Sequence, residues 1–144
     1  MNSTHTCLEC GIAITDNVYH FSKEIYTFPL CFEHQRWIEE SQATDAAIML
    51  YFALKSNKVP VILEYKDGRK TIDIAVPGKL YIEVDGKYNF GAGQALSDLL
   101  ENYHSLKENI PTIRIPNALI YHRYQFGIAV NRLTEMCLGY KQTG

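Results

Sequence analysis

Four residues near the start of the chain carry side chains that bind soft metal ions. Cys7 and Cys10 form one pair with two residues between them, and Cys31 and His34 form a second such pair. The spacing C-x2-C-x20-C-x2-H is typical of a zinc site, because each short loop lets two ligand atoms turn toward one ion. All four tetrahedral positions are filled. We therefore expect the zinc to be structural and not catalytic.

The zinc interpretation leaves alternatives open. His5 and His20 could replace His34 as the fourth ligand, although neither completes a pair with two intervening residues. A disulfide or a chance spacing would explain the cysteines differently, and a reducing cytoplasm disfavours the disulfide. The fourth cysteine, Cys137, falls in the apolar pattern of the last helix, where a free cysteine is usually a small buried hydrophobe.

The segment between the two ligand pairs is rich in aromatic residues. Tyr19, Phe21, Tyr26 and Phe28 favour a small β-hairpin packed beside the metal. Gly11 directly after the first pair allows the positive φ of a zinc knuckle. These features predict a zinc ribbon or a treble-clef finger.

Three acidic residues farther along the chain suggest a different metal chemistry. In a β-strand, successive residues point to opposite faces. Asp73 therefore lies on the face away from Ile72 and Ile74, and Glu83 and Asp85 of the next strand lie together on the face away from Ile82 and Val84. If the two strands pair, the three carboxylates repel one another unless a cation or a shared proton intervenes. Hard oxygen ligands suit Mg2+, and such a site suits phosphodiester hydrolysis. The alternative is that these acids are simply solvated at the surface.

The composition limits the classes of protein to consider. The chain has 144 residues, of which 47% are hydrophobic and 21% charged, which fits one globular domain with a small appendage and excludes disordered and collagen-like chains. No apolar run is long enough for a transmembrane helix, and the polar start is unlike a secretory signal, so we expect a cytoplasmic protein without membrane contact. The net charge of -2 gives no overall attraction to nucleic acid.

The charge pattern divides the chain into two predicted domains. Residues 1–43 contain two basic and six acidic residues and form the zinc-binding module, whereas residues 44–144 carry a net charge of +2. Hydrophobic periodicity and turn signals predict seven elements in the second domain. They are a helix over 44–58, strands over 60–66, 70–76 and 79–85, a helix over 92–109, a strand over 112–115 and a helix over 118–138. This α/β order is αβββαβα.

The motifs in these strands resemble those of a nuclease superfamily. The segments IDIAV, with Asp73, and YIEVDG, with Glu83 and Asp85, in an αβββαβ order, resemble the PD-(D/E)XK or restriction-endonuclease-like nucleases, most closely the branch related to very-short-patch-repair endonucleases. The resemblance covers about residues 44–125. It implies a restriction-endonuclease-like core with an extra C-terminal helix. It also implies a DNA endonuclease in which Asp73, Glu83 and the carbonyl of Val84 hold Mg2+ or Mn2+ and Asp85 completes the catalytic group.

The resemblance extends to two further segments. In this chain they are Asp98 on the following helix and the segment Arg114-Ile115-Pro116-Asn117, which is similar to a strand that ends in R-x-x-N. The lysine of the superfamily motif is replaced by Asp85. Lys87, which could swing into the site, and Gln94, which could orient a water molecule, are the substitutes that we assign to the catalytic group. The alternative for Lys87 is a solvent-facing lysine after a turn.

Three positions depart from the family pattern. The glutamate of the opening helix falls at Ala47, with Asp45 as an offset substitute, a histidine is replaced by Asn89 and an arginine by Glu101. These departures motivate a second hypothesis, a non-catalytic module on a nuclease-like fold that binds nucleic acid or protein. A third hypothesis is a zinc-dependent interaction protein whose acidic residues are only surface.

Basic residues near the predicted strands are candidates for contact with the DNA backbone. They are Lys66, Arg69, Lys70 and Arg114. Tyr121, Tyr124 and Phe126 are interpreted as core residues of the last helix. A protein partner of the zinc module and a homodimer, which family precedent suggests, are the other interactions that we consider.

Overall fold

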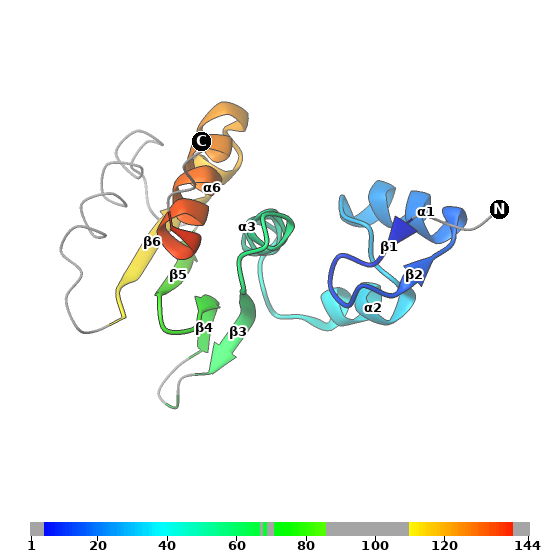
Figure 1. Ribbon diagram of the computed structural model, residues 1–144, viewed down its shortest axis with the longest axis horizontal. Coiled ribbons are helices and arrows are strands. Elements are labelled where there is room, and N and C mark those ends of the chain that lie inside the picture. The colour runs from blue at the N-terminus through cyan, green and yellow to red at the C-terminus, as the bar shows by residue number, and fades with distance from the viewer. Residues whose placement is uncertain (1–4, 67, 69–70, 86–109, 140–144) are drawn as a thin grey trace. The chain divides into compact units, whose positions relative to one another are not determined.

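The chain divides after Gln42 into two units, Met1–Gln42 and Ala43–Gly144, called unit 1 and unit 2 below. The computed structural model describes residues 5–66, 68, 71–85 and 110–139, and Figure 1 shows the elements that they form. In this part of the chain no helix is both long and apolar enough to cross a lipid bilayer.

Unit 1 contains a two-stranded antiparallel sheet and two helices. They are β1 (His5–Thr6), β2 (Ala13–Ile14), α1 (Asp16–Tyr26) and α2 (Phe32–Glu40). The two short strands flank the loop that holds Cys7 and Cys10. The two helices are linked at the surface by the Tyr26 hydroxyl, which donates a hydrogen bond to the Glu39 carboxylate. This bond raises the pKa of Tyr26 to about 12.

The predicted hairpin between the ligand pairs is wrong, because α1 occupies that segment. The Thr15 hydroxyl accepts a hydrogen bond from the Val18 N–H, and Asp16 places a negative charge at the helix N-terminus. The helix ends at Thr27, whose backbone is left-handed with a φ of 74° and whose N–H donates to the Lys23 carbonyl. Local capping therefore outweighs the strand preference of the aromatic residues.

Unit 2 is built on a four-stranded mixed sheet. Its described elements are α3 (Asp45–Ser56), β3 (Ile62–Lys66), β4 (Thr71–Val76), β5 (Leu80–Asp85), β6 (Thr112–Pro116), α5 (Asn117–Ile120) and α6 (Arg123–Leu138). The strand order is β3-β4-β5-β6, antiparallel at the first two pairs and parallel at the third. The four predicted strands and the first predicted helix are thus confirmed. The helix predicted over 92–109 lies outside the described residues.

The core of unit 2 follows the alternation along these strands. Ile72, Ile74, Ile82 and Ile113 are fully buried, whereas their direct neighbours Asp73, Tyr81, Glu83, Thr112 and Arg114 are half-buried or exposed. At the end of β4 the alternation stops, because Ala75 and Val76 are both fully buried. Helix α3 contacts β3, β4 and β5, and α6 contacts α3 and α5. The apolar side of the sheet and these helices form one core, which leaves the opposite face of β4 and β5 for polar side chains.

The single helix predicted over 118–138 is wrong, because the chain forms two helices with a break at Tyr121 and His122. His122 has an extended backbone and begins α6, and its Nδ1 accepts a hydrogen bond from the Gln125 N–H at 3.2 Å. The break turns Tyr121 and Tyr124 into solvent, with 59% and 73% of their surface exposed. The interpretation of these two tyrosines as core residues is therefore also wrong.

Candidate functional site

The four predicted zinc ligands come together in unit 1. The Sγ atoms of Cys7, Cys10 and Cys31 and a ring nitrogen of His34 all lie within 4.8 Å of one another. His34 Nδ1 is 3.2 Å from the Cys31 sulfur and 3.7 Å from the Cys7 sulfur, and the Cys10 and Cys31 sulfurs are 4.0 Å apart. Zn–S bonds of about 2.3 Å and Zn–N bonds of about 2.0 Å place tetrahedral ligand atoms about 3.5–3.8 Å apart. The cluster therefore has the size and donor set of a zinc site.

The first ligand pair is held by a tight turn between β1 and β2. The Cys7 carbonyl accepts a hydrogen bond from the Gly11 N–H, and the Cys7 N–H donates to the Ile12 carbonyl, both at 2.8 Å. Gly11 has a φ of 78°, which a residue with a side chain rarely adopts. This geometry turns both sulfurs of the pair to the same side, as the sequence predicts.

The second ligand pair is held by buried polar side chains. The Ser22 hydroxyl of α1 donates to the Phe28 carbonyl at 2.6 Å and accepts from the Leu30 N–H at 2.8 Å. The Gln35 amide of α2 donates to the Leu30 carbonyl at 2.9 Å. Ser22 and Gln35 are the buried polar residues among those that the structure describes. They fix the loop that leads into Cys31, which precedes the first turn of α2 and brings His34 onto the same side.

The thiols of the cluster have unequal electrostatic environments. Burial alone would raise the pKa of Cys7, but hydrogen bonds from backbone groups of Cys31, Cys10 and Glu9 leave that pKa below its ordinary value. Burial raises the pKa of Cys31 to about 11, and the neighbouring Cys7 sulfur adds to this shift. A cation that binds all four ligands must therefore displace protons, as Zn2+ does at thiol sites.

The alternative histidines lie outside the cluster. His5 Nε2 is 3.3 Å from the Asp16 carboxylate, and its ring stacks on Tyr19 with the ring centres 3.7 Å apart. The ring of His20 contacts the rings of His5 and Tyr19 edge-on. Cys137, in α6, is buried, and burial raises the pKa of its thiol to about 11.

The predicted catalytic carboxylates lie in unit 2, on the polar face of β4 and β5. The antiparallel register pairs Ile74 with Ile82, so Asp73 and Glu83 come next on the two strands. The Asp73 carboxylate accepts a hydrogen bond from the Val84 N–H at 2.8 Å, which fixes its orientation across the strand pair. Asp85 is two residues beyond Glu83 on the same side, and all three acidic residues are half-buried.

These three carboxylates do not form a cluster as tight as the one in unit 1. Among the described residues, only the Cys7, Cys10, Cys31 and His34 group brings three or more ligand atoms within 4.8 Å of one another. Asp45, the substitute for the family's helix glutamate, is exposed in the first turn of α3, and Ala47 is buried. The arrangement offers two neighbouring carboxylates, which is the number that a Mg2+ site commonly uses.

Glu64 is a neighbour of Asp73 that the sequence arguments missed. The register pairs Leu63 with Ile74 and Tyr65 with Ile72, so Glu64 stands opposite Asp73 on β3. Its φ of 55° is in the left-handed region, which is unusual for a residue other than glycine within a strand. A lone glutamate in an apolar run gives no sequence signal of such a position.

Only part of the predicted DNA-contacting set can be placed. Lys66 is exposed at the end of β3, and Arg114 is exposed on β6, where it is the register partner of Glu83. Arg69, Lys70, Lys87 and Gln94 lie outside the described residues, as do Asn89, Asp98 and Glu101. The structure therefore places one basic side chain, Arg114, beside the carboxylates.

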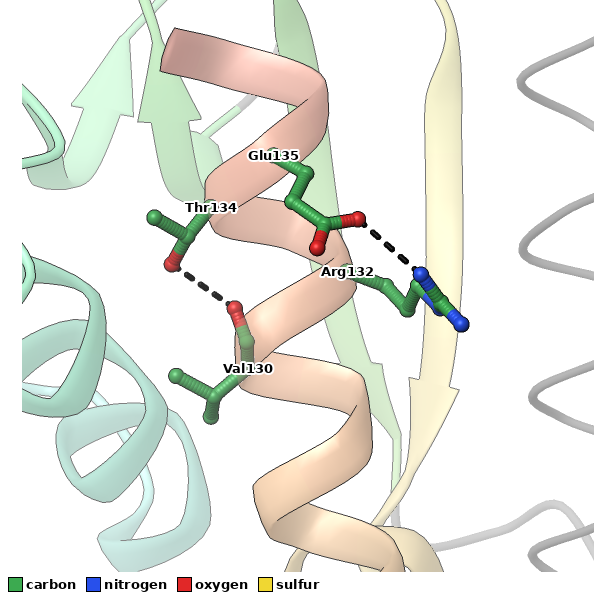
Figure 2. A network of polar contacts seen from close by, with 4 residues as sticks. All are labelled: Val130, Arg132, Thr134 and Glu135. Atoms are coloured by element: carbon green, nitrogen blue, oxygen red, sulfur yellow. Dashed lines mark hydrogen bonds and ion pairs between the residues drawn. The ribbon is translucent and has the colours of Figure 1, made fainter. Parts of the chain in front are cut away.

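A separate cavity of about 400 Å³ lies between the end of α3 and α6, lined by Asn57, Lys58, Asn131, Thr134, Glu135, Leu138 and Gly139. Three of its polar side chains, those of Asn57, Thr134 and Glu135, bond to neighbouring protein groups. Asn57 donates to the Thr134 hydroxyl, which donates to the Val130 carbonyl, and Glu135 forms an ion pair with Arg132. Figure 2 shows the α6 part of this network. These contacts give the cavity walls a structural role.

The comparisons with known proteins add no relative. No protein-family model, curated protein or solved structure matches this chain.

Proposed function

We propose that unit 2 is a metal-dependent nuclease that hydrolyses phosphodiester bonds in DNA, on a restriction-endonuclease-like fold. The observation that carries the proposal is the placement of Asp73 and Glu83 at neighbouring positions of β4 and β5, on the polar face of the sheet. It is supported by the order of a helix, three antiparallel strands and a fourth strand parallel to β5. The motif resemblance described above assigns the catalytic carboxylates to the same two strands.

The side chains have distinct roles in this proposal. Asp73, held by the Val84 N–H, and Glu83 are the carboxylate ligands, and the Val84 carbonyl is the backbone ligand. Asp85 adds negative charge at the end of β5, and Arg114 beside Glu83 holds the phosphate of the substrate. A divalent cation at these carboxylates would activate a water molecule and neutralise charge on the scissile phosphate.

The proposal is tested by cleavage of supercoiled plasmid and labelled single strands, with Mg2+, with Mn2+ and without a divalent ion. Asp73→Asn and Glu83→Gln keep the shape of each side chain and remove its charge. We expect each to slow cleavage by more than about a hundredfold, since even outer-shell partners of a metal cost 10- to 100-fold when removed. Glu135→Gln, which removes a carboxylate of the α6 ion pair, is the matched control and is expected to leave the rate unchanged.

The result that overturns the proposal is equally specific. Cleavage that persists in both Asp73→Asn and Glu83→Gln would not come from this site. If neither Mg2+ nor Mn2+ supports cleavage of any of the substrates, the nuclease assignment is also contradicted.

A second candidate function is a non-catalytic module that binds nucleic acid or protein. The observation that favours it is the spacing of the carboxylates, which do not gather three ligand atoms within 4.8 Å. In that case the wild-type protein would bind without cutting.

The Cys3His cluster supports a structural zinc site in unit 1. The four ligands leave no open position for a water molecule or a substrate, and the net charge of -4 over residues 1–43 argues against broad contact with phosphates. We propose that zinc fixes the fold of unit 1 and that this unit contacts protein and not DNA.

A further inference from the structure

The break between α5 and α6 creates an exposed group of aromatic and basic side chains. We call Tyr121, His122, Arg123 and Tyr124 the aromatic corner; all four are exposed. Tyr124, at 73%, is the most exposed of the large hydrophobic side chains that the structure describes. Two tyrosine rings exposed to water only three residues apart in sequence are typical of a contact surface, because tyrosine loses little conformational entropy when it binds.

The charge around the aromatic corner favours a polyanion. Residues 110–134 contain three arginines and no aspartate or glutamate. Of the three, Arg132 forms an ion pair with Glu135 at 3.0 Å (Figure 2), whereas Arg123 lies between the two tyrosines in sequence and is exposed. An exposed arginine between two exposed rings fits nucleic acid, because the arginine can bind a phosphate and the rings can stack on bases. It fits an acidic peptide less well, since the rings would have no matching partner.

The corner follows the end of the sheet at which the carboxylates lie. Strands β5 and β6 are parallel, and their register pairs Asp85 with Pro116, so both strands end at the same edge. From Pro116 the chain passes directly through α5 into the corner, as Figure 1 shows for the yellow and orange segments. A strand of nucleic acid bound at the corner therefore approaches this edge of the sheet.

We propose that the aromatic corner stacks on unpaired bases, so that the substrate of the nuclease site is single-stranded nucleic acid or a single-stranded region. This inference rests on the proposed nuclease function. Tyrosine rings can stack only on base faces that are not already stacked within a duplex, whereas every unpaired base offers such a face. Arg123 binds the phosphates between the stacked bases.

The test measures binding apart from cleavage. Fluorescence anisotropy measures the binding of labelled single strands of DNA and RNA about 12 nucleotides long and of the matched DNA duplex. Ca2+ replaces Mg2+, so that binding is measured without cleavage. The full-length proteins are the wild type, Tyr121→Ala, Tyr124→Ala and the double variant. The conservative variants Tyr121→Phe and Tyr124→Phe keep the rings. Phe21→Ala, which removes a half-exposed ring in unit 1, is the control for loss of an aromatic surface elsewhere. The DNA and RNA arms identify which strand is preferred.

We expect the wild type to bind a single strand more tightly than the duplex. Each alanine variant should weaken single-strand binding about 5- to 150-fold, and the phenylalanine variants and Phe21→Ala should stay within about twofold of the wild type. Arg123→Gln should reduce the slope of the logarithm of the binding constant against the logarithm of the salt concentration by the amount expected for about one lost phosphate contact. These exposed positions leave the fold intact, which circular dichroism of each variant checks.

Three outcomes would overturn the inference: no binding of single strands by the wild type, equal or tighter binding of the duplex, or unchanged binding by the double alanine variant. None of them depends on cleavage. If the strand-cutting assay fails while the alanine variants lose binding, the nuclease proposal is wrong and the stacking surface stands.

Discussion

The thiols of the Cys3His cluster differ in how their surroundings shift their pKa values. Cys7 is buried and its pKa lies below the ordinary value, whereas the pKa of Cys31 is raised to about 11 by burial. In the absence of metal the cluster thus contains thiols of unequal acidity. Zn2+ bound at this cluster would hold all of them as thiolates, so we expect the loss of one ligand to affect the whole cluster.

Replacing one of these ligands gives the first prediction. Cys31→Ser should lose the zinc, because a neutral hydroxyl is a poor ligand and the remaining three do not close the tetrahedron. The purified wild type should contain about one zinc ion per chain by elemental analysis, and the variant close to none. Cys137→Ser removes a buried thiol in unit 2 and should keep the zinc. Equal zinc content in Cys31→Ser and the wild type would exclude this site.

At the scale of single elements, the sequence predicts what strong local patterns determine. The period-two alternation of apolar residues located β4 and β5 to within one residue, and the x2 ligand spacing identified all four members of the Cys3His cluster. These signals are local, because an alternating strand and a short chelate loop are each defined by a few neighbouring residues.

The wrong or missing predictions concern segments whose structure is set by helix caps or by contacts with distant parts of the chain. Thr15 and Thr27 set the ends of α1, and their hydrogen bonds make a helix from a segment whose aromatic residues favour a strand. His122 begins α6 although histidine is not among the common capping residues, so no pattern marked the break. Glu64 combines a left-handed backbone with a place opposite Asp73 on β4, and sequence spacing describes neither feature.

The second prediction concerns the loop that leads into α2. Ser22→Ala removes a buried hydroxyl that serves two backbone groups, the Phe28 carbonyl and the Leu30 N–H. A buried backbone group left unpaired costs about 1–3 kcal/mol, and this substitution leaves two such groups unpaired. We expect the thermal unfolding of unit 1, followed by the fluorescence of Trp37, to shift to a lower temperature and zinc to dissociate faster.

Ser56→Ala is the matched control for this loss. Its hydroxyl donates to the Phe52 carbonyl within α3, at a position that a helical N–H can also serve, so we expect a change below about 0.5 kcal/mol. An unchanged unfolding temperature in Ser22→Ala would show that the buried hydroxyl does not hold the ligand loop.

At the scale of the whole chain, the two units differ in how they gain stability. The buried apolar side chains described in unit 1 are Cys7, Ile14, Leu30 and Ile38, and Cys7 is a member of the Cys3His cluster. Unit 2 has a continuous core over β3 to β6 and the helices that contact them. We therefore expect unit 1 to depend on a bound metal, because a core this small does not by itself offset the entropy lost on folding.

This difference predicts that metal removal unfolds unit 1 alone. Structural zinc contributes about 10–16 kcal/mol to such small units, and the only tryptophan of the chain, Trp37, packs edge-on against the ligand His34 with the ring centres 5.7 Å apart. A zinc-selective chelator should therefore shift Trp37 emission toward that of a solvated indole. The far-UV circular dichroism of unit 2 and its thermal transition should persist, and added Zn2+, but not Mg2+, should restore the emission. Unchanged Trp37 emission after complete zinc removal would contradict metal-dependent folding, and a single transition in which both units unfold together would contradict their independence.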